Sequence, residues 1–169
     1  MINHWELTKS KLLSLEDALA LTKTLKNQGK KIVFTNGCFD VLHLGHVSYL
    51  AKAASLGDCL VVALNTDTSV RAQNKAPNRP IHDEGARRLV IASLSCVDGV
   101  ILFDENTPLN AIETLLPDVL VKGADYDAKE VDKDSARYIV GSDVVIKNGG
   151  EVATIEFVEG HSTSNILSK

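Results

Sequence analysis

The sequence predicts a single-domain α/β protein whose core is a doubly wound sheet of five parallel strands. Five short apolar segments, rich in β-branched residues, alternate along the chain with amphipathic stretches at helical spacing. Strands that alternate with helices form parallel sheets with helices packed on both faces. A chain of 169 residues is long enough for one domain with a sizeable core, so residues 1–169 are expected to fold as one unit.

The order of the elements follows from these patterns and from helix caps. The predicted strands cover residues 31–35, 59–64, 99–103, 119–122 and 151–157. The helices predicted between them cover residues 45–56, about 67–73, 83–95, 107–116 and 139–148. Ahead of the first strand, the spacing of Ser14 and Asp17 is typical of a capping box, which marks a helix start. Residues 1–30 are therefore expected to be an N-terminal helical extension of a core formed by residues 31–167.

The charge, the apolar runs and the cysteines of the chain indicate which binding partners and which cell compartment to expect. The formal net charge of -4 disfavours nucleic acid, because a phosphate backbone is bound by a basic surface. The longest apolar run, residues 59–64, is far shorter than the roughly 20 residues of a membrane helix, so no membrane partner is expected. Cys38, Cys59 and Cys96 show no paired spacing, which argues against a disulfide scaffold and fits a reducing compartment. We therefore expect a cytoplasmic protein.

Residues 35–46 join the first strand to the next helix and carry the most specific chemical signal. The segment ends in His43-x-Gly45-His46, so both histidines are expected in the first helical turn. A helix N-terminus presents free N–H groups and a partial positive charge to phosphate oxygens, and Gly45 leaves the approach open. Imidazole N–H groups at positions i and i+3 share one face, where both would donate to an oxygen that gains charge in phosphoryl or nucleotidyl transfer.

Spacing alone leaves two further roles open for this histidine pair. A His-x-x-His pair on a helix can be half of a metal site, and a histidine can be purely structural. Metal sites usually need three or four ligands, and the remaining histidines, His4, His82 and His161, are scattered along the sequence. The sequence contains neither GxGxxG nor GxxxxGKS/T, so it supports neither a dinucleotide-binding fingerprint nor a P-loop kinase.

Two polar loops, residues 73–82 and 123–136, follow predicted strands. Open α/β sheets bind their ligands at this edge. The first loop carries Lys75 and Arg79 between two prolines, either to neutralise phosphate or as part of a surface crossover.

The segment Thr-Asn-Gly-Cys-Phe-Asp-Val-Leu-His-Leu-Gly-His at residues 35–46 resembles the HxGH nucleotidyltransferases, the cytidylyltransferase-like superfamily. Its closer match is to the bacterial D-glycero-β-D-manno-heptose 1-phosphate adenylyltransferases. Four later segments resemble that family in the same order: residues 64–70, the Arg-Pro loop at 79–81, Lys-Gly-Ala-Asp-Tyr at 122–126 and Gly-His-Ser-Thr-Ser at 160–164. Five motifs in the right order are far more specific than any one of them.

The resemblance implies a Rossmann-like nucleotidyltransferase fold and a reaction. AMP would pass from ATP, with Mg²⁺, to D-glycero-β-D-manno-heptose 1-phosphate, which gives ADP-heptose and pyrophosphate for lipopolysaccharide core synthesis. A homodimer or higher homo-oligomer is also implied. Two alternatives stay open: a glycerol-3-phosphate-type cytidylyltransferase that uses CTP, and a non-catalytic nucleotide-binding regulatory module.

The resemblance also assigns roles to single residues, with the metal ligands left unknown. The catalytic residues are His43, His46 and Lys11. The nucleotide-binding residues are Thr35, Asn36, Gly37, Phe39, Gly45, Lys122, Gly123, Asp125, Ser162 and Thr163. The substrate-binding residues are Asp40, Asn65, Asp67 and Arg79. Simpler roles compete for some of them: a turn or capping carboxylate for Asp40, a solvated side chain for Lys11, and a helix cap for Asn65 or Asp67.

The chain departs from the family pattern at two points and leaves one arginine unassigned. Residues 73–80 are one residue longer than the common Leu-Lys-Gly-x-x-Arg-Pro, so the alignment of Arg79 is clearer than that of Lys75. Ala124 replaces the usual second glycine, a mild change unless the backbone there has a positive φ. Arg87 aligns with a family arginine, although arginines on helices usually lie on the surface.

Overall fold

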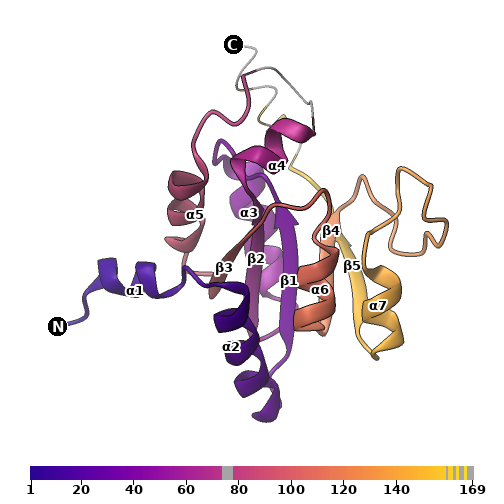
Figure 1. Ribbon diagram of the computed structural model, residues 1–169, viewed down its shortest axis with the longest axis horizontal. Helices are drawn as coiled ribbons and strands as arrows, with labels where there is room; N and C mark the ends of the chain where they lie inside the picture. Colours follow the sequence, from indigo (N-terminus) through magenta and orange to yellow (C-terminus); the bar gives the residue numbers. More distant parts are fainter. Residues whose placement is uncertain (74–77, 159, 162, 164–165, 167–169) are drawn as a thin grey trace.

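The computed structural model describes residues 1–73, 78–158, 160–161, 163 and 166. In these residues five parallel strands form one sheet in the order β3-β2-β1-β4-β5 (Figure 1). The strands are β1 (Ile32–Gly37), β2 (Cys59–Asn65), β3 (Gly99–Phe103), β4 (Val119–Gly123) and β5 (Glu151–Ile155). The predicted fold class is confirmed. The strand ends differ from the prediction by two residues at most, with β1 running two residues further and β5 ending two residues earlier.

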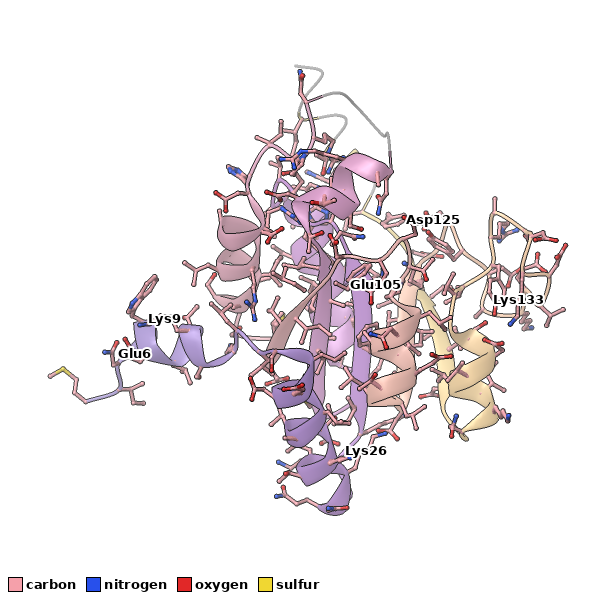
Figure 2. The ribbon with its side chains drawn as sticks, in the orientation of Figure 1. Glu6, Lys9, Lys26, Glu105, Asp125 and Lys133 are labelled. Carbon is pink, nitrogen blue, oxygen red and sulfur yellow. The ribbon has the colours of Figure 1, made fainter. Side chains whose placement is uncertain are left out.

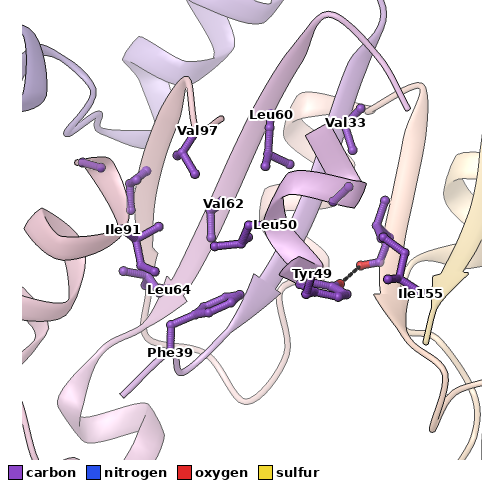
Figure 3. Packing of buried hydrophobic residues seen from close by; sticks show 14 of the residues in the cluster. Val33, Phe39, Tyr49, Leu50, Leu60, Val62, Leu64, Ile91, Val97 and Ile155 are labelled. Carbon is purple, nitrogen blue, oxygen red and sulfur yellow. Dashed lines mark hydrogen bonds between the residues drawn. The ribbon is translucent and has the colours of Figure 1, made fainter. Parts of the chain in front are cut away.

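Helices cover both faces of this sheet. They are α1 (His4–Ser10), α2 (Leu15–Asn27), α3 (Leu44–Ala54), α4 (Asp67–Ala72), α5 (Glu84–Ala92), α6 (Leu109–Leu115) and α7 (Ser142–Lys147). Side chains from α3 and α5 pack in one core cluster with one face of the strands (Figure 3). Side chains from α2, α6 and α7 pack in a second cluster on the opposite face. The sheet is therefore doubly wound, as the alternation of strands and helices predicts.

The two clusters explain why the strands appear in the sequence as runs of consecutive apolar residues. Along β2, Leu60, Val62 and Leu64 belong to the first cluster, while Cys59, Val61 and Ala63 belong to the second. Successive side chains of a strand point to opposite faces, and both faces here are covered by helices. Every residue of β2 is therefore buried.

The N-terminal extension contains one expected helix and one further helix. Helix α2 begins with the predicted capping box, in which the Ser14 and Asp17 side chains each bond the other's backbone N–H. Helix α1 precedes it, buries none of its residues and stands away from the sheet (Figure 1). Between the two helices, Leu12 pairs with Val100 at the start of β3. The extension is therefore attached at the edge of the sheet formed by β3.

The strand order places a ligand crevice at the carboxyl ends of β1 and β4. The chain winds outward from β1 through β2 and β3, then crosses back to β4 on the other side of β1. In open α/β sheets ligands bind at this reversal, outside the carboxyl ends of the two strands. Residues 35–46 leave β1 at this edge, and residues 122–126 leave β4 there. No helix among the described residues is long and apolar enough to cross a membrane.

Candidate active site

His43 and His46 form a stacked pair at the N-terminus of α3. His43 is the N-cap residue, and its Nδ1 accepts a long hydrogen bond of 3.4 Å from the backbone N–H of His46. The two imidazole rings lie 3.8 Å apart between centroids, with 22° between their planes. The pair therefore stands at the positive end of the helix dipole, in the first turn where the spacing predicts it.

Burial keeps both imidazoles neutral near pH 7. It lowers the pKa of His46 to about 4, and the charge of the neighbouring His43 acts in the same direction. The pKa of His43 is also lowered, first by burial and then by the charge of His161. Because Nδ1 of His43 is an acceptor, the neutral ring carries its proton on Nε2. His43 can thus donate a hydrogen bond from Nε2 without carrying a net charge.

A pocket of about 680 Å³ opens beside this pair. It brings together the following predicted residues: Asn36, Gly37, Phe39, His43, Gly45, His46, Arg79, Lys122, Gly123, Asp125 and Thr163. They come from the ends of β1 and β4, the start of α3, the Arg-Pro loop and the C-terminal segment. Asp125 lies just beyond β4, on the side of the molecule to which β1 and β4 run (Figure 2). The predicted residues Lys75 and Ser162 lie outside the described part of the chain.

The backbone around the histidines is tightly packed. A Cβ on Gly45 would lie 2.9 Å from the carbonyl oxygen of His161 and 2.9 Å from Cε1 of His43. Phe39 adopts a left-handed conformation with φ of 45°, which is rare for a bulky residue and costs free energy. Its ring packs 5.1 Å from that of His46 and also blocks any side chain at Gly37. The surrounding packing thus keeps Phe39 in this strained conformation, with its ring against the second histidine.

Two cationic side chains line the pocket together with the histidines. The Lys122 ammonium at the end of β4 donates a hydrogen bond of 3.1 Å to Oδ1 of Asn36. The guanidinium of Arg79 donates from Nε to Oδ2 of Asp40 at 3.0 Å, and four further N–H donors remain on it. Ala124, two residues after Lys122, is not among the described residues with positive φ, so the missing second glycine causes no strain there.

Asp40 anchors the Arg-Pro loop from a fully buried position. Besides Arg79, its carboxylate accepts the backbone N–H groups of Ile81 and His82 at 2.8–3.0 Å. Burial raises the pKa of Asp40, but the hydrogen bonds from His82, Ile81 and Arg79 outweigh it and hold the pKa below the usual value. The structure therefore gives Asp40 the competing role of a turn carboxylate, and substrate contact remains only a prediction.

Arg87 is buried and makes several hydrogen bonds, whereas a helical arginine was expected to lie on the surface. Its guanidinium donates to the carbonyl oxygens of Cys38, Asn65 and His82 and to Oδ1 of Asp67, at 2.7–3.0 Å. Only 1% of the residue is exposed. Asn65 and Asp67 are thus engaged in ordering the loops around α4 and do not line the pocket. Their predicted substrate contact gains no support from these positions.

Two more predicted residues lie outside the pocket. Thr35 is buried beneath it, where its hydroxyl bonds the Tyr49 hydroxyl at 2.7 Å and donates to the Val121 carbonyl oxygen at 3.0 Å. Lys11 sits beside the start of β3, and its ammonium donates to the Leu94 carbonyl oxygen. That is the amino end of the strands, opposite to the histidines. The structure does not bring Lys11 to the site, because residues 11–13 are bonded there along β3.

Several residues that line the pocket were not predicted from the sequence. The residues that line the pocket without having been assigned to it are Cys38, Tyr49, Tyr126, Phe157, Val158, Gly160 and His161. Tyr49 follows His46 by three residues, so helical spacing indicates the same face. Phe157 and Val158 follow β5 at the carboxyl edge of the sheet, which was the signal available for them.

The fold and this site define a nucleotidyltransferase: a doubly wound parallel sheet with a histidine pair, a helix N-terminus and cations around one pocket. The chain belongs to the cytidylyltransferase-like family, whose model matches residues 34–169. It is 55% identical over 158 residues to the bifunctional protein HldE of Azorhizobium caulinodans, covering 94% of this chain and 31% of that protein. It is 48% identical over 167 residues to the HldE of Wolinella succinogenes, covering 99% of this chain and 32% of that protein. The chain thus spans about a third of the length of these relatives.

Solved structures agree with the observed fold. The lipopolysaccharide core biosynthesis protein of Thermoplasma volcanium is 32% identical, with a TM-score of 0.59, over 79% of this chain and all of that chain. A pantoate-beta-alanine ligase of Francisella tularensis has a TM-score of 0.57 at 16% identity, over 90% of this chain and 68% of that one, and is similar in fold alone.

Proposed function

We propose that this chain transfers AMP from ATP to D-glycero-β-D-manno-heptose 1-phosphate and releases pyrophosphate, producing ADP-heptose for lipopolysaccharide core synthesis. The observation that carries the proposal is the stacked pair of His43 and His46 on the N-terminus of α3, in one pocket with Lys122 and Arg79. This arrangement suits a triphosphate, because it offers neutral donors, a helix dipole and two cations together. The similarity to HldE over nearly the whole chain supports the choice of sugar phosphate and ATP.

The chain's own groups act by positioning and by stabilising charge. A sugar 1-phosphate is an anion at neutral pH, so one of its oxygens attacks the α-phosphorus of ATP without a strong general base. The Nε2–H of His43 and the neutral ring of His46 donate to the oxygens that gain charge in the transition state. Lys122 and Arg79 neutralise phosphates, Arg79 with the planar guanidinium suited to bidentate contact. Pyrophosphate leaves on the side opposite the attacking oxygen.

The described residues fit a Mg²⁺ ion that would be held mainly by the nucleotide. Among the described residues, no group of three or more His, Cys, Asp or Glu side chains is placed to hold a metal ion. Mg²⁺ commonly uses one or two carboxylates and otherwise water and substrate phosphates, so a site of this kind suits it. Asp125 is the carboxylate on the described pocket wall. When bound, the ion supplies Lewis-acid neutralisation of the triphosphate.

The cellular setting proposed for this reaction follows from chemistry and resemblance. ATP and sugar phosphates are substrates of the cytoplasm, and Cys38, Cys59 and Cys96 are free thiols in the structure. We place the protein in the cytoplasm, as a homodimer or higher homo-oligomer, with no nucleic acid or membrane partner.

The test is pyrophosphate release by the purified protein with Mg²⁺. ATP and CTP are each combined with D-glycero-β-D-manno-heptose 1-phosphate and with glycerol 3-phosphate, and His46→Ala is the control variant. The proposal expects turnover with ATP and the heptose phosphate, and a loss of about 100- to 1000-fold in His46→Ala. Turnover with CTP and glycerol 3-phosphate would replace it by the cytidylyltransferase alternative. ATP binding without pyrophosphate release from any pair would favour the regulatory module.

A further inference from the structure

Two of the contacts that Lys122 makes reach residues from different strand ends. Its ammonium donates to Oδ1 of Asn36 at 3.1 Å and lies 4.7 Å from the ring centroid of Tyr126. Asn36 belongs to β1, next to the loop that carries the histidines, whereas Tyr126 follows β4. A cation this close to an aromatic face is attracted by the electron-rich ring. The ammonium is thus fixed between an amide and an aromatic ring at the pocket wall.

The backbone fixes the ring of Tyr126 in this position. The N–H of Tyr126 donates to the Gly123 carbonyl oxygen at 3.0 Å, which closes a turn and brings the ring back over Lys122. The N–H of Ala124 donates to the Ile155 carbonyl oxygen at 3.0 Å and ties the same turn to the end of β5. A Cβ on Gly123 would clash with the ring of Phe157, so the turn is also closely packed. The ring is half-buried and its placement follows from the turn.

Lysine gains more from such support than arginine does. Its ammonium is a point charge on a flexible four-carbon chain with large rotamer entropy. A donor that is to act on a triphosphate must be in place before the charge develops, because reorganisation during the reaction raises the barrier. Partners that restrict Lys122 before the nucleotide binds lower that cost.

We propose that Tyr126 is a positioning residue whose ring holds the Lys122 ammonium at the pocket wall, ready for the phosphates of the nucleotide. This inference rests on the proposed adenylyl transfer and adds a residue to it. The ring acts through its face, so the phenol oxygen is dispensable and the aromatic ring is not. The effect of Tyr126 therefore depends on the presence of Lys122.

A double-mutant cycle on kcat/KM for ATP tests this dependence. Tyr126→Leu keeps an apolar side chain without the ring and is expected to lower kcat/KM about 2- to 30-fold. Tyr126→Phe restores most of the loss, because it keeps the ring. In a Lys122→Met background, Tyr126→Leu is expected to have little further effect. An equal loss with and without Lys122, or a loss in Tyr126→Phe as large as in Tyr126→Leu, would overturn the proposal.

Tyr138→Leu is the matched control. Tyr138 lies on the same connection between β4 and α7, but its hydroxyl donates to Asp143 on α7. The same substitution there should leave kcat/KM unchanged, and a loss equal to that of Tyr126→Leu would show a general effect of the connection.

A second readout needs no turnover. The ε-methylene protons of Lys122 should show an upfield ring-current shift in the nucleotide-free wild type and in Tyr126→Phe, and should lose it in Tyr126→Leu. Should no phosphate acceptor be turned over, the cycle is repeated on the Kd for ATP by calorimetry. Coupling in Kd without turnover would sustain the role of Tyr126 and remove the proposed reaction. Turnover without coupling would sustain the proposed reaction and overturn the role of Tyr126. If the protein neither releases pyrophosphate nor binds ATP, both proposals are overturned.

Discussion

Nη2 of Arg87 lies 2.8 Å from Oδ1 of Asp67, in an ion pair whose arginine side chain is fully buried. The same guanidinium bonds the carbonyl oxygen of Cys38, inside the loop that leads to His43. One side chain of α5 therefore joins the start of α4 to the loop that carries the catalytic candidates. A buried charge is tolerated only with partners for its donors, and Arg87 has four.

Replacing Arg87 by Met should strongly destabilise the fold. The change leaves the Asp67 carboxylate and three carbonyl oxygens without their donor, and breaking a buried pair costs about 3–5 kcal/mol. Chemical denaturation should show this loss in the free energy of unfolding. Arg137→Met is the matched control, because Arg137 pairs with Asp127 at 3.9 Å on the exposed surface. Exposed pairs contribute at most about 1 kcal/mol, so equal losses in the two variants would contradict the assignment.

Asp40→Asn should loosen the Arg-Pro loop. The carboxylate accepts the N–H groups of Ile81 and His82, and an amide offers fewer and weaker acceptor sites. Hydrogen exchange at these two amides should accelerate by about 10- to 150-fold, corresponding to the roughly 1.5–3 kcal/mol of a hydrogen bond to a charged group. The Ala86 amide, which donates to the separate carboxylate of Asp83, is the internal reference. Unchanged exchange at Ile81 and His82 would show that Asp40 does not hold this loop.

Strands β1 to β4 could be predicted from the sequence because they are buried on both faces. An unbroken run such as residues 59–64 has few alternatives, and each helix between strands carries its own apolar stripe or cap. Helix α1 gave no such signal. It has seven residues, none of them buried, and depends on the Asn3 cap and the attachment of residues 11–13 to β3. Short helices held only by their ends do not show in apolar periodicity.

Local motifs located the site, but long-range pairing decided the role of each polar residue. The stacked pair of His43 and His46 follows from four consecutive positions at a helix start. Asp40 instead pairs with Arg79, 39 positions away in sequence, and Arg87 reaches Cys38, 49 positions away, which no local pattern reveals. The same limit explains Lys11, whose position depends on strand pairing at the amino end of β3.

Gly45→Ala should impair catalysis much more than stability. The added methyl group would overlap the His161 carbonyl oxygen and push the His43 ring, both of which line the pocket. Because displacement of a catalytic group by about 1 Å can cost 100-fold in rate, we expect a fall in kcat of at least tenfold. Gly85→Ala on α5 is the control, since its Cβ would meet only Asp83 Oδ1, at 3.2 Å. There the helix should be slightly stabilised and kcat retained; an equal loss in both variants would refute the steric argument.

Mild acid should destabilise the protein through His46. Its pKa is about 4 in the folded protein and about 6.5 when unfolded, so the unfolded chain binds an extra proton between these values. The free energy of unfolding should therefore fall as the pH drops from about 6.5 to 4. Below pH 4 His46 should cause no further loss. Among its charged neighbours, His43 and Arg79 oppose protonation and Asp40 favours it. With partial solvent screening, the expected loss is about 2–3 kcal/mol. Unfolding measured across this range should show it in the wild type and much less in His46→Asn, and identical pH profiles would contradict a buried neutral imidazole.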